Sequence, residues 1–174
     1  MLEERGDKIT NVSACKNPGA LGYRAGCISY TTRNYMVSQE AKAQGVDITP
    51  ITKAVQRKAS LASVAEMATR MKDKTSTADY IHAMFFNQMA LDAYDCQIVE
   101  ESHDRTVVEY HYCPLVAAWQ KLGLSNQEIG DLCLSAMEGD TIMANALDFD
   151  LDIQKTIGCG HDCCRMVITT RKKA

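Results

Sequence analysis

Two pairs of short strand-like runs, separated by long helical patterns, constrain the fold of this chain most. The first pair, CQIVEE and TVVEYHY, is rich in β-branched and aromatic residues, and the turn-forming residues 102–105 join its two runs. The second pair, FDLDIQKTI and CCRMVITTR, stands near the C-terminus and encloses the stretch GCGHDCC. The pattern predicts four strands that pair mainly in antiparallel fashion.

Helical patterns precede each pair of strands. Apolar residues recur every three or four positions from Thr49 onward, and Pro50 suits the first turn of a helix. A second helix is expected over residues 76–94. After Pro114 come LVAAWQKLG and then SNQEIGDLCLSAMEGDTIMANAL, where Ser125 and Glu128 have the spacing of a capping box.

This order of elements predicts the fold class. Runs of helices that alternate with runs of strands are typical of an α+β domain, with helices packed on one face of a mainly antiparallel sheet. Residues 1–48, with NPGALGYRAGC and no sustained period, are expected to form an irregular or helical N-terminal arm. Residues 49–174 are then expected to form a single α+β domain, which is helical over residues 49–94 and contains the sheet and further helices over residues 95–174.

Composition limits the class of protein. The 174 residues can bury a core without disulfides, so the eight cysteines are not needed for folding. No signal peptide or membrane-spanning run is present, which predicts a cytoplasmic protein with reduced cysteines and no membrane partner. The net charge is -3 and the basic cluster at residues 171–173 is a terminal tail, so no nucleic-acid partner is expected. A homo-oligomer is compatible with this composition.

Cys113 is the most informative cysteine of the chain. It follows a predicted strand and precedes Pro114, which makes it the expected N-cap of a helix. Free amides and the positive end of the helix dipole favour a thiolate at this position, the form that attacks carbon or binds metal. The competing interpretation is a small buried hydrophobic residue. His111, two residues earlier, would face the same side as Cys113 if the strand continues that far.

Asp140 is the second candidate, because it lies in EGDTIMANAL among apolar neighbours, where a carboxylate is costly unless it is paired or used. Alternatively, Gly139 breaks the helix and Asp140 caps the next segment. Cys133 and Met137 are expected to belong to the core.

The stretch GCGHDCC concentrates possible metal ligands near the C-terminus. Cys159, His161 and Cys163 could hold zinc or iron, but a structural zinc site usually draws two close pairs from separate segments, and no second pair is present. Cys163 and Cys164 are neighbours in a predicted strand, so their side chains should point to opposite faces of the sheet.

Residues 96–168 resemble the L-2-amino-thiazoline-4-carboxylic acid hydrolase family. The resemblance rests on the order of pieces in YCPLVAAWQKLGLSNQEIGDLCLSAMEGDTIMANALDFDLDIQKTIGCGHDCC: a strand that enters Cys-Pro, a Leu-Gly helix end, a helical aspartate and a final Gly-x-Asp-x-Cys. It implies that Cys113, Asp140 and Cys164 occupy the catalytic positions of the family. Gly160 and Asp162 precede the last of these, whereas His161, Cys159 and Cys163 depart from the pattern.

The resemblance implies a cofactor-independent hydrolase that opens a small carbon-nitrogen heterocycle, with an aminothiazoline carboxylate as the small-molecule substrate. Either Cys113 attacks the ring carbon as a thiolate, or ionised Asp140 delivers water to it. His111, His161, Asp162 and Arg165 are expected to bind the substrate, and Arg165 or Arg24 would supply a cation for its carboxylate.

A second resemblance leads to a different class of protein. The end of the chain is similar to a 4-vinyl reductase-type domain, which binds a small ligand and is not an enzyme by itself. In that case Cys159, His161 and Cys163 would be metal ligands. A similar thiol-carboxyl-thiol set in organomercurial lyase also leaves carbon-metal chemistry open.

Overall fold

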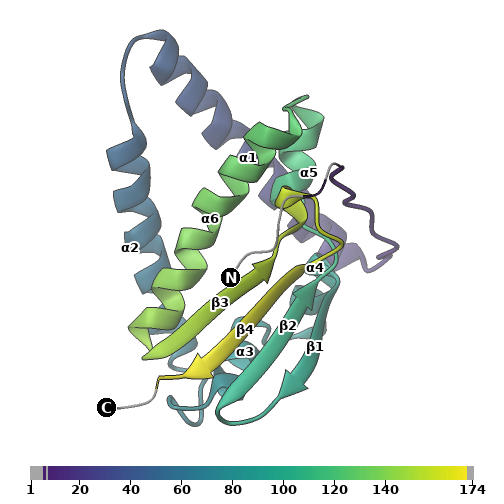
Figure 1. The fold of residues 1–174 in the computed structure, drawn as a ribbon, viewed down its shortest axis with the longest axis vertical. Helices are drawn as coiled ribbons and strands as arrows, with labels where there is room; N and C mark the ends of the chain where they lie inside the picture. The colour runs from purple at the N-terminus through teal and green to yellow at the C-terminus, as the bar shows by residue number, and fades with distance from the viewer. Residues whose placement is uncertain (1–5, 7, 172–174) are drawn as a thin grey trace.

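The computed structural model describes residue 6 and residues 8–171 (Figure 1). Within these residues, helices precede and follow the first two strands, as the sequence predicts. The elements in chain order are α1 (Pro18–Ala43), α2 (Thr49–Met67), α3 (Thr77–Met84), α4 (Gln88–Tyr94), β1 (Cys96–Glu101), β2 (Arg105–Tyr110), α5 (Pro114–Lys121), α6 (Asn126–Ala146), β3 (Phe149–Lys155), a single 3-10 turn η1 (Ile157–Cys159) and β4 (Cys164–Thr170).

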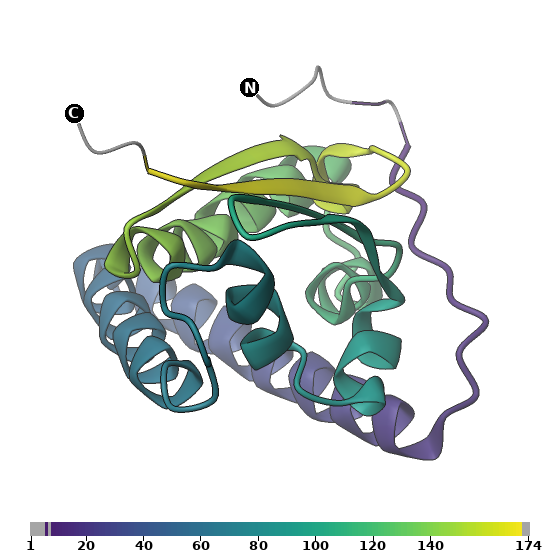
Figure 2. The same cartoon turned by 90° about the horizontal axis from the view of Figure 1, so that it is seen from below.

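The four strands form one antiparallel sheet in the order β1-β2-β4-β3. Figure 2 shows this sheet edge-on with the helices on one side, which confirms the α+β prediction. Alternate residues of the two central strands face the helices, among them Val108, Tyr110, Cys164 and Met166, and they belong to the hydrophobic core.

α6 lies between the sheet and α2 (Figure 1). Its residue Gly139 leaves room for α2, because a Cβ atom there would approach the side chains of Gln56 and Ser60 to 3.2 Å. The Gln56 amide donates hydrogen bonds to the carbonyls of Ser135 and Ala136, at 3.1 and 3.0 Å. The helix runs through Gly139 without a break, so Asp140 is a mid-helix residue and does not cap a new segment.

Within the predicted irregular or helical arm, residues 18–43 form the 26-residue helix α1, so the irregular alternative is wrong for this part. Asn17 caps its start and Pro18 occupies its first turn. The buried guanidinium of Arg24 connects α1 to the end of α4. It donates hydrogen bonds to the backbone carbonyls of Ala93 and Asp92, both at 2.7 Å. The helix is therefore an integral part of the packed structure.

The prediction of one continuous helix over residues 76–94 is also wrong, because residues 85–87 interrupt it and divide it into α3 and α4. Asn87 starts the second piece as its N-cap, and its side chain accepts a hydrogen bond from the amide of Ala90.

Among the described residues, no helix is long and apolar enough to cross a membrane. Lys172 and Lys173 of the basic tail, like the first five residues, lie outside the described part of the chain. The division into an arm and a domain, the cytoplasmic location and the homo-oligomer stay predictions.

Candidate active site

Cys113 caps the N-terminus of α5, as its position before Pro114 predicts. The backbone amides of Leu115 and Val116 interact with its thiol and lower the pKa. Burial acts in the opposite direction and is the larger effect, so the pKa of Cys113 rises from 9.0 to about 12. Burial therefore outweighs the helix terminus and favours the neutral thiol of Cys113 over the thiolate that the sequence predicts.

Asp140 extends from the middle of α6 toward the buried side of the molecule. Burial raises the pKa of its carboxyl group from 3.8 to about 6, and its own backbone amide offsets this only in part. A carboxyl with this pKa is mostly ionised at pH 7 and still accepts a proton readily, which is the property of a general base.

Cys164, the first residue of β4, faces the same core. Its Sγ accepts a hydrogen bond from the backbone amide of Ile157 at 3.3 Å, and burial raises the pKa of its thiol. The electrostatic interaction with Cys113 raises that pKa further, so the two thiols lie within electrostatic range of each other. Cys163 precedes β4, so it is not part of the strand in which the sequence places it; it is buried but does not belong to the core cluster that contains Cys164.

Asp140 connects these thiols electrostatically to further groups. Its charge raises the pKa values of Cys113 and Cys133. It also raises those of Tyr80 and Tyr110, although burial is the main cause for both tyrosines and keeps their hydroxyl groups neutral. We call these residues the thiol-carboxyl cluster: Tyr80, Tyr110, Cys113, Cys133, Asp140 and Cys164.

The thiol-carboxyl cluster is assembled from α3, β2, α6, β4 and the start of α5. Cys133 stands seven residues before Asp140, two helical turns away on the same face of α6, and the backbone of Gly158 packs directly against it. Tyr110 ends β2, three residues before Cys113. Cys113 therefore lies within electrostatic range of both Asp140 and Cys164, the other two residues to which the family resemblance assigns catalysis.

His111 and Arg165, two of the predicted substrate-binding residues, do not join this cluster. β2 ends at Tyr110, so His111 lies beyond the strand, and its Nε2 stands 3.5 Å from Oε2 of Glu109. Arg165 pairs with Glu109 across the β2-β4 register and also donates to Gln154 at 3.3 Å. Glu109 and Arg165 alternate with the core residues Tyr110 and Cys164, and so they occupy the open face of the sheet.

The terminal loop, residues 156–163, is held by hydrogen bonds and an ion pair between its own residues and the end of β3. Nδ1 of His161 contacts the backbone of Thr156 at 3.0–3.1 Å, and the exposed carboxylate of Asp162 pairs with Lys155 at 3.4 Å. Burial is the main cause that raises the pKa values of Cys133 and Cys163, and electrostatic interactions with Cys159 and with Asp162, respectively, add to it. Among residues 6 and 8–171, no group of three or more His, Cys, Asp or Glu side chains is arranged to hold a metal ion. The alternative ligand set Cys159, His161 and Cys163 therefore does not converge.

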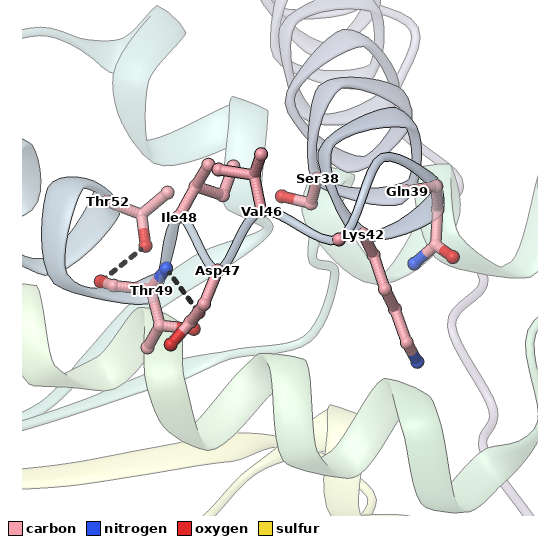
Figure 3. Close-up of a pocket in the computed structure, with 9 residues that line it drawn as sticks. Ser38, Gln39, Lys42, Val46, Asp47, Ile48, Thr49 and Thr52 are labelled. Atoms are coloured by element: carbon pink, nitrogen blue, oxygen red, sulfur yellow. Dashed lines mark hydrogen bonds between the residues drawn. The ribbon is translucent and has the colours of Figure 1, made fainter.

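Two surface hollows lie away from the cluster. Figure 3 shows one at the bend between α1 and α2, where the Thr49 amide donates to Asp47 at 2.9 Å and the Thr52 hydroxyl donates to the Thr49 carbonyl at 3.0 Å. The other lies between α1 and the segment that contains Ser13, and Tyr112 borders it. Neither is lined by a residue of the thiol-carboxyl cluster, so the chemistry of the buried groups, not the shape of the surface, identifies the candidate site.

Sequence reasoning missed Tyr80 and Tyr110 and assigned Cys133 to the core alone. The seven-residue spacing of Cys133 and Asp140 on one helix was available as a signal. For Tyr110, the alternation with Val108 predicts an inward side chain. The contribution of Tyr80 depends on how α3 packs on β2, for which the sequence has no local signal.

The fold and the site define an α+β protein with a partly buried aspartate among cysteines and tyrosines at one end of an antiparallel sheet. The family model described as L-2-amino-thiazoline-4-carboxylic acid hydrolase matches residues 30–168, and the chain belongs to this family. The match confirms the resemblance predicted for residues 96–168 and extends it over α2 and the C-terminal half of α1. Comparisons with curated proteins and with solved structures found no match.

Proposed function

We propose that the protein is a hydrolase that opens the ring of an aminothiazoline carboxylate or a related cyclic amidine, and that the thiol-carboxyl cluster is its active site. The family name supports the reaction class. The observation that supports the site is Asp140, a carboxyl group whose pKa burial raises to about 6. Strongly perturbed titratable groups that lie together are typical of active sites.

In the proposed mechanism, Asp140 is the general base. Its carboxylate takes a proton from a water molecule while the water oxygen bonds to the ring carbon between sulfur and nitrogen, and the π electrons of the ring carbon-nitrogen double bond move to the nitrogen, which takes the proton from Asp140. In the resulting tetrahedral adduct, Asp140 removes the hydroxyl proton as the carbonyl bond forms and a ring bond breaks. The electron pair of that ring bond goes to the leaving sulfur or nitrogen, which receives the proton from Asp140. One water molecule is consumed and Asp140 returns to its ionised form. Cleavage of the carbon-sulfur bond yields an N-carbamoyl cysteine, whereas cleavage of the ring carbon-nitrogen bond yields an S-carbamoyl cysteine.

Cys113 fits the role of a neutral partner better than that of a nucleophile. A thiol with a pKa of about 12 contains little thiolate at pH 7, and removal of its proton by a base with a pKa of about 6 is unfavourable. The neutral hydroxyl groups of Tyr80 and Tyr110 are suitable hydrogen-bond donors for negative charge that develops on the substrate. Asp140 as the base for water is therefore the mechanism that we favour over attack by Cys113.

Asp140→Asn tests this function directly. The purified protein is incubated with L-2-amino-thiazoline-4-carboxylic acid, and the products are identified by mass spectrometry and by release of a free thiol. Loss of a general base typically reduces the rate about 100- to 10,000-fold. Asp131→Asn is the matched control, because it changes an exposed carboxylate on the same helix.

Three outcomes distinguish the possibilities. Turnover by wild type and Asp131→Asn but not by Asp140→Asn supports the proposal. Equal turnover by all three proteins excludes Asp140 as the base. Failure of the folded wild type to hydrolyse this compound and other cyclic amidines excludes the hydrolase and leaves the small-ligand-binding domain.

A further inference from the structure

The residues before α1 form an extended segment that precedes the family match and lies against the candidate site. We call Gly6 and residues 8–17 the N-terminal strap. Figure 2 shows it running along the side of the molecule, from the sheet to the start of α1. Odd-numbered residues from Ile9 to Asn17 are at least partly buried, whereas the even-numbered ones are exposed. This alternation of two is that of an extended chain with one side against the protein.

Asn11 connects the strap to Cys113. Its side-chain Oδ1 accepts a hydrogen bond from the backbone N–H of Cys113 at 2.8 Å, and its Nδ2 donates to the backbone carbonyl of Cys113 at 2.9 Å. One side-chain amide thus pairs with both backbone groups of a residue 102 positions away in sequence. Such a two-point contact fixes orientation as well as distance.

Cys113 needs this partner because of its place in the fold. It lies three residues beyond the end of β2, so the sheet does not pair its N–H, and it is the N-cap of α5, whose N–H lies outside the helical hydrogen-bond pattern. Its carbonyl also accepts from the amide of Ala117 at 3.1 Å. Asn11 therefore completes the backbone hydrogen bonding of Cys113 and sets the direction of its Cα–Cβ bond.

The strap also contacts the terminal loop. The backbone N–H of Gly6 donates to the carbonyl of Cys159 at 2.9 Å. The approach is so close that a Cβ atom on Gly160 would lie 2.6 Å from the carbonyl oxygen of Gly6. The strap consequently contacts two of the three segments that bring thiols to the cluster, the start of α5 with Cys113 and the loop that leads to Cys164.

We infer that Asn11 is a positioning residue of the active site and that the N-terminal strap completes a site which the family match covers only from residue 30 onward. The inference rests on the proposed function. Asn11 acts through Cys113: it holds the thiol toward Asp140 and does not touch the substrate.

The test compares Asn11→Ala with Ser13→Ala. Ser13 is the matched control, because its hydroxyl belongs to the same strap and accepts hydrogen bonds from Arg24 at 2.7 Å and from the amide of Cys15 at 3.1 Å, whereas Asn11 bonds to Cys113. For each variant, kcat and KM for the aminothiazoline carboxylate are measured, together with the rate at which iodoacetamide alkylates Cys113, followed by peptide mass spectrometry. Thermal unfolding reports on stability.

Asn11→Ala is expected to lower kcat about 10- to 100-fold with little change in KM, because misplaced catalytic groups reduce the rate at this scale. It is also expected to raise the alkylation rate of Cys113, since the thiol is released from its buried position. Ser13→Ala is expected to lower the unfolding temperature without either effect. Asn11→Asp keeps the acceptor for the Cys113 N–H and loses the donor, so an intermediate kcat is expected even if Asn11→Ala does not fold.

Equal kcat values in the Asn11 and Ser13 variants would overturn the inference, as would an unchanged alkylation rate of Cys113 in a folded Asn11→Ala protein. The alkylation rate needs no substrate. If the wild type fails to hydrolyse the ring, the proposed function fails, while the alkylation comparison still decides whether Asn11 positions Cys113.

Discussion

At the scale of single residues, Cys113 shows how two opposing effects are decided by their size. A helix N-terminus stabilises a negative charge by about 0.3–2 kcal/mol. Full burial raises the pKa of a thiol by up to about 5, which corresponds to about 7 kcal/mol. The sequence reveals the helix terminus but not the depth of burial, and the burial determines the result for Cys113.

The pH dependence of alkylation tests this conclusion. With a pKa of about 12, the thiolate fraction of Cys113 increases about tenfold per pH unit throughout the neutral and mildly alkaline range. The expected alkylation rate by iodoacetamide therefore rises without a plateau between pH 7 and pH 10, as followed on the Cys113 peptide by mass spectrometry. A plateau below pH 8 would show a stabilised thiolate and would restore Cys113 as the nucleophile.

At the scale of elements, the close packing of η1 on α6 brings Cys133 against the terminal loop. A Cβ atom on Gly158 would lie 2.6 Å from the Sγ atom of Cys133. Gly158→Ala is expected to reduce the free energy of unfolding by about 1–3 kcal/mol, because the core must move to accept the methyl group. Urea unfolding measures this loss.

Gly26→Ala is the control for Gly158→Ala. Gly26 lies inside α1, and a Cβ atom there meets no other atom within 4 Å. This substitution is expected to increase the free energy of unfolding by about 0.5–1 kcal/mol, because alanine loses less backbone entropy in a helix. If both variants are destabilised equally, the contact between Gly158 and Cys133 has no special importance.

The elements also show what the sequence can predict. The four strands lie where alternation and turn residues place them, because local pattern and burial agree there. α1 was missed because Gly19, Gly22 and Gly26 weaken its helical pattern and much of its surface is exposed. Asn17 followed by Pro18 was a helix-start signal that the turn-like composition obscured. The contact between Asn11 and Cys113 spans most of the chain, and no local pattern predicts it.

At the scale of the whole molecule, the candidate site costs stability. Burial of an ionisable carboxyl group is unfavourable in the charged form, and the rise in the pKa of Asp140 from 3.8 to about 6 corresponds to about 3 kcal/mol of destabilisation at neutral pH. The groups that interact electrostatically with Asp140 come from α3, from α6, from the start of α5 and from the sheet. The packing of these elements therefore has to compensate for the loss of stability. A buried group that weakens the fold and is still present is typical of function.

Asp140→Asn is therefore expected to be more stable than wild type at neutral pH. The folded protein binds the Asp140 proton more tightly than the unfolded chain does, so between pH 3.8 and about 6 the wild type loses stability as the pH rises. The variant lacks this titration. The free energy of unfolding of the variant should exceed that of the wild type by a small amount near pH 4. This difference should increase toward pH 6 and stay constant above it, at a value at most about 3 kcal/mol higher than at pH 4.

Urea unfolding of both proteins at pH 4, 5, 6 and 7.5 measures the difference. A difference that does not change with pH would show that Asp140 has an ordinary pKa in the folded protein, and an exposed carboxylate of that kind would be an unsuitable base for the proposed reaction.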